Sequence, residues 1–146
     1  MVVFQRLERA LGAALAGEVR FDNGARAAYA SDASNYRQVP LGVVLTRTLD
    51  DVVAAVALCR EHGAAILPRG AGTSMCGQRV NAALVIDCSK YLDRVLAVDA
   101  ASRTARVEPG VVCDAQATVL ASGFSCREQI EALARRPTLH LAEIIV

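Results

Sequence analysis

Apolar residues recur at helical spacing near the start of the chain. Phe4, Leu7, Leu11 and Leu15 lie three or four positions apart, and Gly17 follows the last of them. This spacing puts the four side chains on one face of an α-helix, and a glycine just beyond the last turn is a common helix end. The pattern therefore predicts an amphipathic helix that ends before Gly17.

The next stretch alternates between a short strand and polar segments. We expect a strand over residues 18–21, stopped by a turn at residues 22–24 (Asp-Asn-Gly). Residues 29–37 are polar and lack a pattern, so they are interpreted as a loop, although Tyr29 and Tyr36 both need partners for ring and hydroxyl. Two interpretations of this loop stay open: a packed surface loop, which the polarity favours, and a loop that faces a cofactor.

After Pro40 the pattern indicates a strand, a helix and a second strand. Residues 43–46 are predicted to form the first strand, and Thr48 with Asp51 three positions later has the spacing of a capping box at a helix start. Gly63 ends this helix. The residues expected to form its buried apolar side are Leu49, Val52, Val53, Val56 and Leu58. With a strand over residues 64–67, the segment predicts a parallel βαβ unit.

A glycine-rich stretch leaves the carboxyl end of that second strand. Residues 68–78 read Pro-Arg-Gly-Ala-Gly-Thr-Ser-Met-Cys-Gly-Gln. Glycine has no Cβ, so successive backbone N–H groups can approach the oxygen atoms of an anion closely. We therefore expect the glycine loop, defined as residues 70–78, to bind a phosphate or pyrophosphate, with Arg69, Thr73 and Ser74 adding donors.

Two common phosphate loops do not fit this stretch. A P-loop requires a lysine after its last glycine, and the glycine loop contains none. The dinucleotide motif G-x-G-x-x-G fails because Met75 stands where the third glycine belongs. An enzyme that uses a nucleoside triphosphate is therefore disfavoured.

The pattern beyond the loop predicts three more strands. Residues 83–88 form an apolar run typical of a buried strand. Residues 94–99 and 103–108 flank Ala-Ala-Ser at positions 100–102, which predicts an antiparallel hairpin. A second glycine turn, Pro109-Gly110-Val111, follows the hairpin.

Composition limits the class of protein. With 146 residues, 53% of them hydrophobic and only 4% aromatic, the chain can bury one modest core built from alanine, valine and leucine. The net charge of +1 argues against a nucleic-acid or anionic-membrane partner, and no apolar run is long enough for a membrane span, so we expect a cytoplasmic protein. The five scattered cysteines indicate reduced, mostly buried thiols rather than disulfides or a zinc site.

The string Arg-Gly-x-Gly-Thr-Ser-x-x-Gly-Gln at residues 69–78 resembles the pyrophosphate loop of FAD-linked oxidases of the vanillyl-alcohol oxidase type, the PCMH-type FAD-binding domain. The resemblance runs from Tyr29 to Asp114 and includes Asp-Ala-Ser at 32–34, Thr-Leu-Asp-Asp-Val at 48–52, Leu-Val-Ile-Asp at 84–87 and Val-Glu-Pro-Gly-Val at 107–111. It is strongest to the FAD subunits of D-lactate dehydrogenases and glycolate oxidases.

This resemblance implies a fold class, a cofactor and a set of site residues. The fold is α+β: the α/β-like first lobe of a PCMH-type domain, with a βαβ unit, a glycine loop and an antiparallel hairpin, and then a helical C-terminal tail. The cofactor implied by the resemblance is FAD. The implied contacts of its pyrophosphate and ribityl region are Arg69, Gly70, Ala71, Gly72, Thr73, Ser74, Gly77 and Gln78, and those near the flavin or adenosine are Pro109, Gly110 and Val111.

After Asp114 the resemblance to the FAD domain stops. The tail instead resembles the C-terminal end of the iron–sulfur oxidoreductase module fused to some of these enzymes, with a helix expected from Ser125 to about Arg135 and His140 on a helix face. Cys126 alone cannot hold a cluster. We therefore expect three segments: residues 1–36 (N-terminal helix and loop), 37–114 (partial FAD domain) and 115–146 (tail).

The expected function follows from this organisation. The chain is interpreted as an FAD-binding fragment of an oxidoreductase that acts on small 2-hydroxy acids of the D-lactate or glycolate type. No catalytic base, no arginine cluster for a carboxylate and no metal site is identified, so catalysis by the chain alone is not expected. The alternative is a non-catalytic remnant or binding module that associates with a partner chain, either one that transfers electrons or one that completes the domain.

Overall fold

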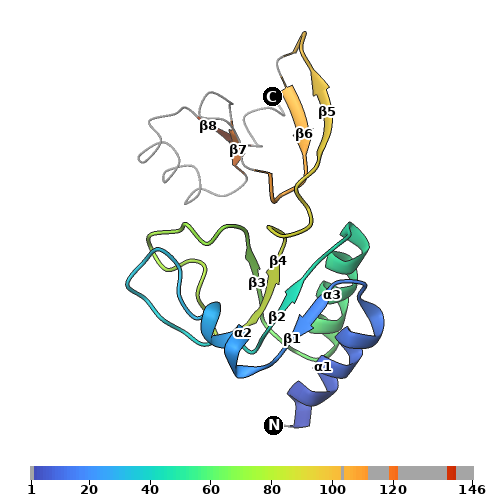
Figure 1. Cartoon of the computed structure of the whole chain (residues 1–146), viewed down its shortest axis with the longest axis vertical. Helices are drawn as coiled ribbons and strands as arrows, with labels where there is room; N and C mark the ends of the chain where they lie inside the picture. Colours follow the sequence, from blue (N-terminus) through green and yellow to red (C-terminus); the bar gives the residue numbers. More distant parts are fainter. Residues whose placement is uncertain (1, 103, 112–118, 122–137, 141–146) are drawn as a thin grey trace. The chain divides into compact units, whose positions relative to one another are not determined.

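The computed structural model describes residues 2–102, 104–111, 119–121 and 138–140 (Figure 1). The chain divides into two compact units, Met1–Val111 and Val112–Val146, and each is described by itself. The described part of the first unit contains, in chain order, α1 (Val2–Ala14), β1 (Glu18–Arg20), α2 (Asn23–Ala28), β2 (Gly42–Leu45), α3 (Leu49–Glu61), β3 (Ile66–Arg69), β4 (Leu84–Asp87), β5 (Val95–Asp99) and β6 (Thr104–Val107).

A four-stranded sheet in the order β1-β2-β4-β3 forms the centre of the first unit. Both β2 and β3 pair with β4 in parallel, and β1 pairs with β2 antiparallel. The predicted parallel strand–helix–strand unit is confirmed, but β4 lies between its two strands. All four residues of β4 are buried, as the continuous apolar run of its sequence predicts for a central strand.

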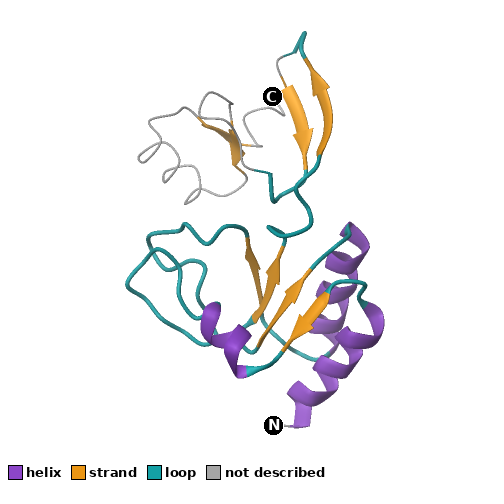
Figure 2. Cartoon of the chain, in the orientation of Figure 1, coloured by secondary structure: helices purple, strands orange, loops and turns teal. Residues whose placement is uncertain are grey.

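Two helices, α1 and α3, lie side by side on one side of this sheet (Figure 2). Leu7 and Leu11 of α1 are fully buried and pack with Val44, Leu84 and Ile86 of the sheet. The predicted stripe is confirmed at these positions and at the partly buried Leu15, but not at Phe4, which is 42% exposed. Each such side chain contributes roughly 1.5–3 kcal/mol when it is removed from water. This cluster is the main core of the unit.

The predicted buried side of α3 is partly wrong. Leu49, Val53 and Val56 are 61%, 67% and 42% exposed. The helix instead buries Ala55 and Cys59, one turn apart, and these small side chains let its backbone approach its neighbours closely. The apolar residues of α3 itself lie on most sides of the helix, so their spacing in the sequence could not show which side is buried.

The predicted capping box at the start of α3 is confirmed, and its acid does more than cap. Asp51 is only 4% exposed and accepts hydrogen bonds from the backbone N–H of Arg47 and Thr48 at 2.8 and 3.3 Å. Its other oxygen accepts from the N–H of Ala16, just beyond α1, at 2.8 Å. One buried carboxylate therefore fastens the end of one helix to the start of the other.

The predicted turn at residues 22–24 begins a short helix, α2, instead of only reversing the chain. The Asp22 side chain accepts a hydrogen bond from the Ala25 N–H at 2.9 Å, as an N-cap residue does. Three of the next residues, 25, 27 and 28, are alanines with a high helix propensity. The cap and these alanines together continue the turn into a helix.

The antiparallel hairpin is confirmed as β5 and β6, with an irregularity in its register between Val95 and Ala97. An ion pair closes its open end, because the buried Glu108 carboxylate accepts from the Arg94 backbone N–H and from Nε and Nη2 of the Arg94 guanidinium. These hydrogen bonds lower the pKa of Glu108. The residue after Glu108 begins the Pro109-Gly110-Val111 turn.

This ion pair predicts a pH-dependent stability. A carboxyl whose pKa is lowered by folding stabilises the protein fully above its unfolded pKa, about 4.3 for glutamate, and loses that contribution as the pH falls through its folded pKa. Thermal unfolding midpoints of the wild type and Glu108→Gln, measured from pH 7 to pH 3, should therefore differ most above about pH 4.3 and approach each other as the pH falls below that value. A difference that stays constant over this range would contradict the role of the ion pair.

The described part of the second unit consists of two short parallel strands, β7 (Val119–Ala121) and β8 (Thr138–His140). The expected placement of His140 on a helix is therefore wrong, because this residue belongs to a strand. The helix expected from Ser125 to Arg135 lies outside the described residues. None of the described helices is both long and apolar enough to cross a membrane.

Candidate functional site

The two glycine turns predicted to contact a cofactor both lie close to Cys88, the residue that follows β4. The glycine loop begins at the carboxyl end of β3, where the Arg69 carbonyl accepts a hydrogen bond from the Cys88 N–H at 3.1 Å, just after β4. The N–H of Gly110 donates to the Leu92 carbonyl at 2.7 Å, and a Cβ at Gly110 would lie 2.7 Å from the Cys88 carbonyl oxygen. The carboxyl ends of parallel strands are where ligands bind in α/β sheets.

Two glycines of the loop have backbone conformations that other residues rarely adopt. Gly72 has φ +70°, and a Cβ there would lie 2.5 Å from Nη2 of Arg69. Gly77 has φ +78°, and its Cβ would lie 2.6 Å from the ring of Tyr36. Both positions therefore favour glycine for conformation, and a Cβ at either one would also displace a neighbouring side chain. Gly70 differs, because the space where its Cβ would stand is open.

The backbone of the loop carries a row of unused hydrogen-bond donors. Within the described part of the chain, the N–H groups of Gly70 to Gly77 donate to no protein acceptor. Ala71 and Thr73 are exposed to solvent, and Ser74 is half-buried. Free N–H groups on a glycine-bent backbone are the donor set that a pyrophosphate requires, so the residues present fit that part of FAD.

The guanidinium of Arg69 is directed to the backbone of the protein. Its Nη1 donates to the carbonyl oxygens of Tyr29 and Arg79 at 3.4 and 3.3 Å, and its Nη2 donates to that of Ser31 at 3.0 Å. It also lies over the Tyr29 ring, 5.0 Å from its centre. Arg69 therefore ties residues 29–31 to the base of the glycine loop, and its contact with FAD stays a prediction.

Tyr29 finds partners for both its ring and its hydroxyl, as the packed-loop interpretation requires. The hydroxyl donates to the carboxylate of Asp87, the last residue of β4, at 2.5 Å. Burial, together with this hydrogen bond, raises the pKa of Tyr29 well above its usual value. The second Asp87 oxygen accepts from the N–H and hydroxyl of Ser89, both at 2.7 Å.

Sequence reasoning missed a second link, between Asp32 and Arg79. One Asp32 oxygen accepts from the N–H of Ser34 at 2.9 Å and from its hydroxyl, and the other accepts from the Arg79 N–H at 3.3 Å. Burial opposes the charged form, but these hydrogen bonds outweigh it and lower the pKa of Asp32. A serine two positions after an aspartate is a signal for such a turn. Nothing in the sequence indicates the contact with Arg79.

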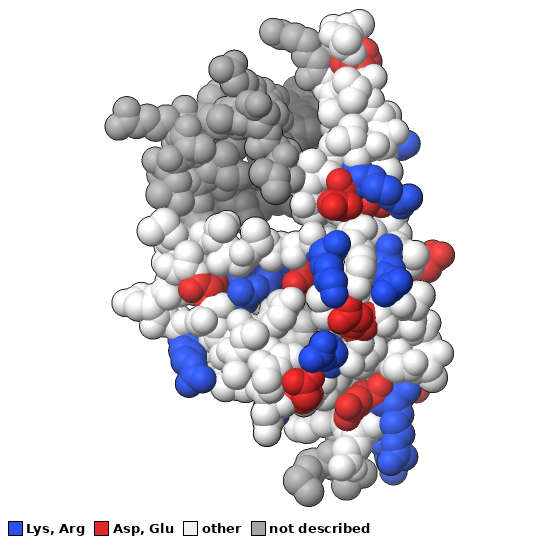
Figure 3. All heavy atoms as spheres, in the orientation of Figure 1, with Lys and Arg blue, Asp and Glu red and all other residues white. Residues whose placement is uncertain are grey.

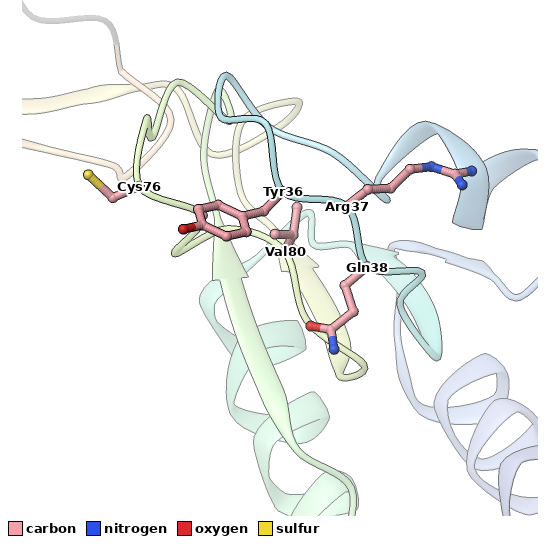
Figure 4. A pocket seen from close by; sticks show the side chains of 6 residues that line it. Tyr36, Arg37, Gln38, Cys76 and Val80 are labelled. Carbon is pink, nitrogen blue, oxygen red and sulfur yellow. The ribbon is translucent and has the colours of Figure 1, made fainter.

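A pocket of about 360 Å³ lies between residues 36–38 and residues 76–80 (Figure 4). Its lining residues are Tyr36, Arg37, Gln38, Cys76, Gly77 and Val80. Tyr36 is 62% exposed, so the second tyrosine of the loop does not share the buried environment of the first. The thiol of Cys76 is exposed, contrary to the expectation of mostly buried thiols, whereas Cys59 is buried and Cys88 is half-buried.

Neither a concentration of one charge on the face drawn in Figure 3 nor a metal-binding cluster is found among the described residues. Acidic and basic side chains are interspersed on the face drawn in Figure 3, in agreement with the net charge of +1. Among the described residues no group of three or more His, Cys, Asp or Glu side chains could hold a metal ion.

Comparison with known proteins identifies the family. The sequence profile of the FAD-binding domain family matches residues 40–128, more than half of the chain. The chain therefore belongs to this family of FAD-binding domains, and FAD is its cofactor. The matched residues include the glycine loop and the Pro109-Gly110-Val111 turn. The boundary predicted at residue 114 stays a prediction.

Curated relatives are similar over the same region. The chain is 34% identical over 103 residues to the glycolate oxidase subunit GlcD of Bacillus subtilis, which covers 67% of this chain and 22% of that protein. It is 33% identical over 92 residues to the D-2-hydroxyglutarate dehydrogenase of Escherichia coli K12, which covers 61% of this chain and 9% of that one. The chain thus spans about a fifth or less of the length of these relatives.

Solved structures show the same fold. Alkyldihydroxyacetonephosphate synthase aligns with a TM-score of 0.65 at 20% identity over 88% of this chain and 27% of that one. p-Cresol methylhydroxylase aligns with a TM-score of 0.61 at 21% identity over 76% of this chain and 23% of that one. The expected PCMH-type α+β fold is thereby confirmed, and at these identities the likeness concerns the fold alone.

Proposed function

We propose that the chain binds FAD through the glycine loop, with the N–H groups of Gly70 to Gly77 facing the pyrophosphate and Thr73 and Ser74 adding hydroxyl donors. The row of free N–H groups at the carboxyl end of β3 carries this proposal. Gln78 and the turn Pro109-Gly110-Val111 complete the proposed contacts. Residues 37–114 form the FAD-binding segment, and residues 115–146 form a tail outside it.

We further propose that the reaction supported by this domain is the oxidation of a small 2-hydroxy acid. The relatives named for glycolate and D-2-hydroxyglutarate support that substrate class. FAD supplies hydride-accepting chemistry when it is bound. The residues of this chain contribute binding and orientation of the cofactor, and the proposal assigns no catalytic base to them.

A titration with FAD, followed by quenching of flavin fluorescence, tests the proposed cofactor site. Saturable binding is expected for FAD and at least tenfold weaker binding for riboflavin, because riboflavin lacks the pyrophosphate and each lost charged hydrogen bond costs about 1.5–3 kcal/mol. Equal affinity for the two flavins would show that the glycine loop does not hold the pyrophosphate. Absence of saturable FAD binding would reject the proposal for this chain.

The second candidate function is association with a partner chain that completes the domain. The exposed apolar side chains of β5, with Val95 57% and Val98 71% exposed, favour it, because a two-stranded hairpin is marginally stable alone. We expect the purified chain to self-associate in size-exclusion chromatography and Val98→Lys to reduce this association. A chain that runs as a monomer at all concentrations would argue against the partner.

A further inference from the structure

The glycine loop is held by the segment that precedes β2, here called the 29–37 loop (residues 29–37). Three hydrogen-bonded contacts join the 29–37 loop to the glycine loop and to the two arginines that flank that loop. Arg69 donates to carbonyl oxygens of Tyr29 and Ser31 at the start of the glycine loop. The Ala33 N–H donates to the Gly72 carbonyl at 3.1 Å in its middle. Asp32 accepts from the Arg79 N–H at its end.

Arg79 carries the third contact across the glycine loop. Its Nη1 donates to the Pro68 carbonyl at 2.5 Å, and its Nε lies 3.4 Å from the Ser74 hydroxyl oxygen. The side chain therefore reaches back to the residues where the loop begins, while its backbone N–H is held by Asp32. Arg79 therefore links Pro68, which precedes the glycine loop, to the chain that follows the loop.

The contact at Gly72 also sets the direction of a free donor. A trans peptide is planar, and its C=O and N–H point in opposite directions. Because the Gly72 carbonyl points to Ala33, the N–H of Thr73 in the same peptide points away from the 29–37 loop. The same reasoning applies to Gly70, whose N–H points away from Cys88 because the Arg69 carbonyl accepts from that residue.

We infer that Asp32 is a positioning residue for the cofactor: by joining Ser34 to Arg79 it holds the 29–37 loop against the glycine loop and so fixes the direction of the free N–H groups. This inference rests on the proposed FAD site. A carboxylate suits the position because both of its oxygens accept, and here one faces Ser34 and the other faces Arg79. An asparagine has one acceptor oxygen and can keep only one of these two contacts.

The test compares Asp32→Asn, Asp32→Ala and a matched control, Asp22→Asn. Asp22 also caps a backbone N–H with its carboxylate, but it serves α2, and asparagine is an equally good cap. FAD affinity is measured by fluorescence quenching in the full chain. We expect Asp32→Ala to bind FAD at least tenfold more weakly than the wild type, Asp32→Asn to lie between them, and Asp22→Asn to match the wild type.

A second readout separates positioning from general destabilisation. Backbone ¹⁵N order parameters of residues 70–77 in the cofactor-free chain are expected to fall from near 0.85 towards 0.6 or below in the Asp32 variants and to stay unchanged in Asp22→Asn. If Asp32→Ala does not fold, the same comparison is made with Asp32→Asn. Wild-type affinity in a folded Asp32 variant overturns the inference, and so does a loss of affinity with wild-type order parameters.

The two proposals fail in different ways. If the wild type shows no saturable FAD binding, the proposed function fails, and the order parameters alone decide whether Asp32 orders the loop. If the wild type binds FAD and the Asp32 variants bind equally well, the cofactor site stands and the positioning role is rejected.

Discussion

Asp51→Ala is expected to lower the free energy of unfolding by about 3–5 kcal/mol. The change leaves the backbone N–H groups of Ala16, Arg47 and Thr48 without their acceptor, and a hydrogen bond to a charged carboxylate contributes about 1.5–3 kcal/mol. It also removes the capping box of α3. Because small domains are stable by only about 5–15 kcal/mol, we expect a large part of the chain to unfold at 37 °C.

Urea denaturation followed by circular dichroism measures this loss. The matched control is Asp50→Ala, which removes the neighbouring acid on the same helical turn, where the side chain is exposed. That change should stay within about 0.5 kcal/mol of the wild type, as surface substitutions usually do. Equal effects of the two substitutions would contradict the role assigned to the buried carboxylate.

Gly72→Ala is expected to weaken FAD binding by at least a hundredfold. At φ +70° an alanine costs roughly 1–2 kcal/mol, and its Cβ would also lie 2.5 Å from the Arg69 guanidinium. The guanidinium would have to move, releasing the carbonyl oxygens of Tyr29 and Ser31 and misplacing the free N–H groups of the glycine loop. Fluorescence titration with FAD measures the effect.

Gly63→Ala is the control for backbone strain. Gly63 follows α3 with φ +64°, and nothing lies within 4 Å of where its Cβ would stand. The substitution should therefore lower stability by a similar 1–2 kcal/mol while FAD affinity stays at the wild-type value. If Gly63→Ala reduces FAD affinity as much as Gly72→Ala, the loss reflects stability rather than the geometry of the loop.

The order of strands and helices in the first unit could be predicted largely from the sequence. Thr48 and Asp51 marked the start of α3, and the run at residues 84–87 marked a buried strand, because these signals depend on local chemistry. The position of β4 between β2 and β3 could not be predicted, since it depends on pairing between distant segments. The exposed side of α3 was missed for the same reason: apolar residues alone do not indicate what packs against them.

The candidate site was predictable only in part. The glycine string predicted a loop bent for close approach, and Gly72 and Gly77 have the required positive φ. The contact between Asp32 and Arg79 joins residues 47 positions apart, which no local pattern encodes. The exposure of Cys76 likewise depends on the packing of the glycine loop beside Tyr36 and Arg37, which are distant in sequence.

The central place of β4 in the sheet has a consequence for how the chain acquires its structure. In the four-stranded sheet β3 is hydrogen-bonded only to β4, which is the last of the four strands in sequence. On the ribosome, β3 therefore has no strand to pair with until residue 87 has emerged, and the strand from which the glycine loop starts stays outside the sheet until then. Long-range parallel pairing of this kind is slow, so ordering of the cofactor loop belongs to the late steps of folding.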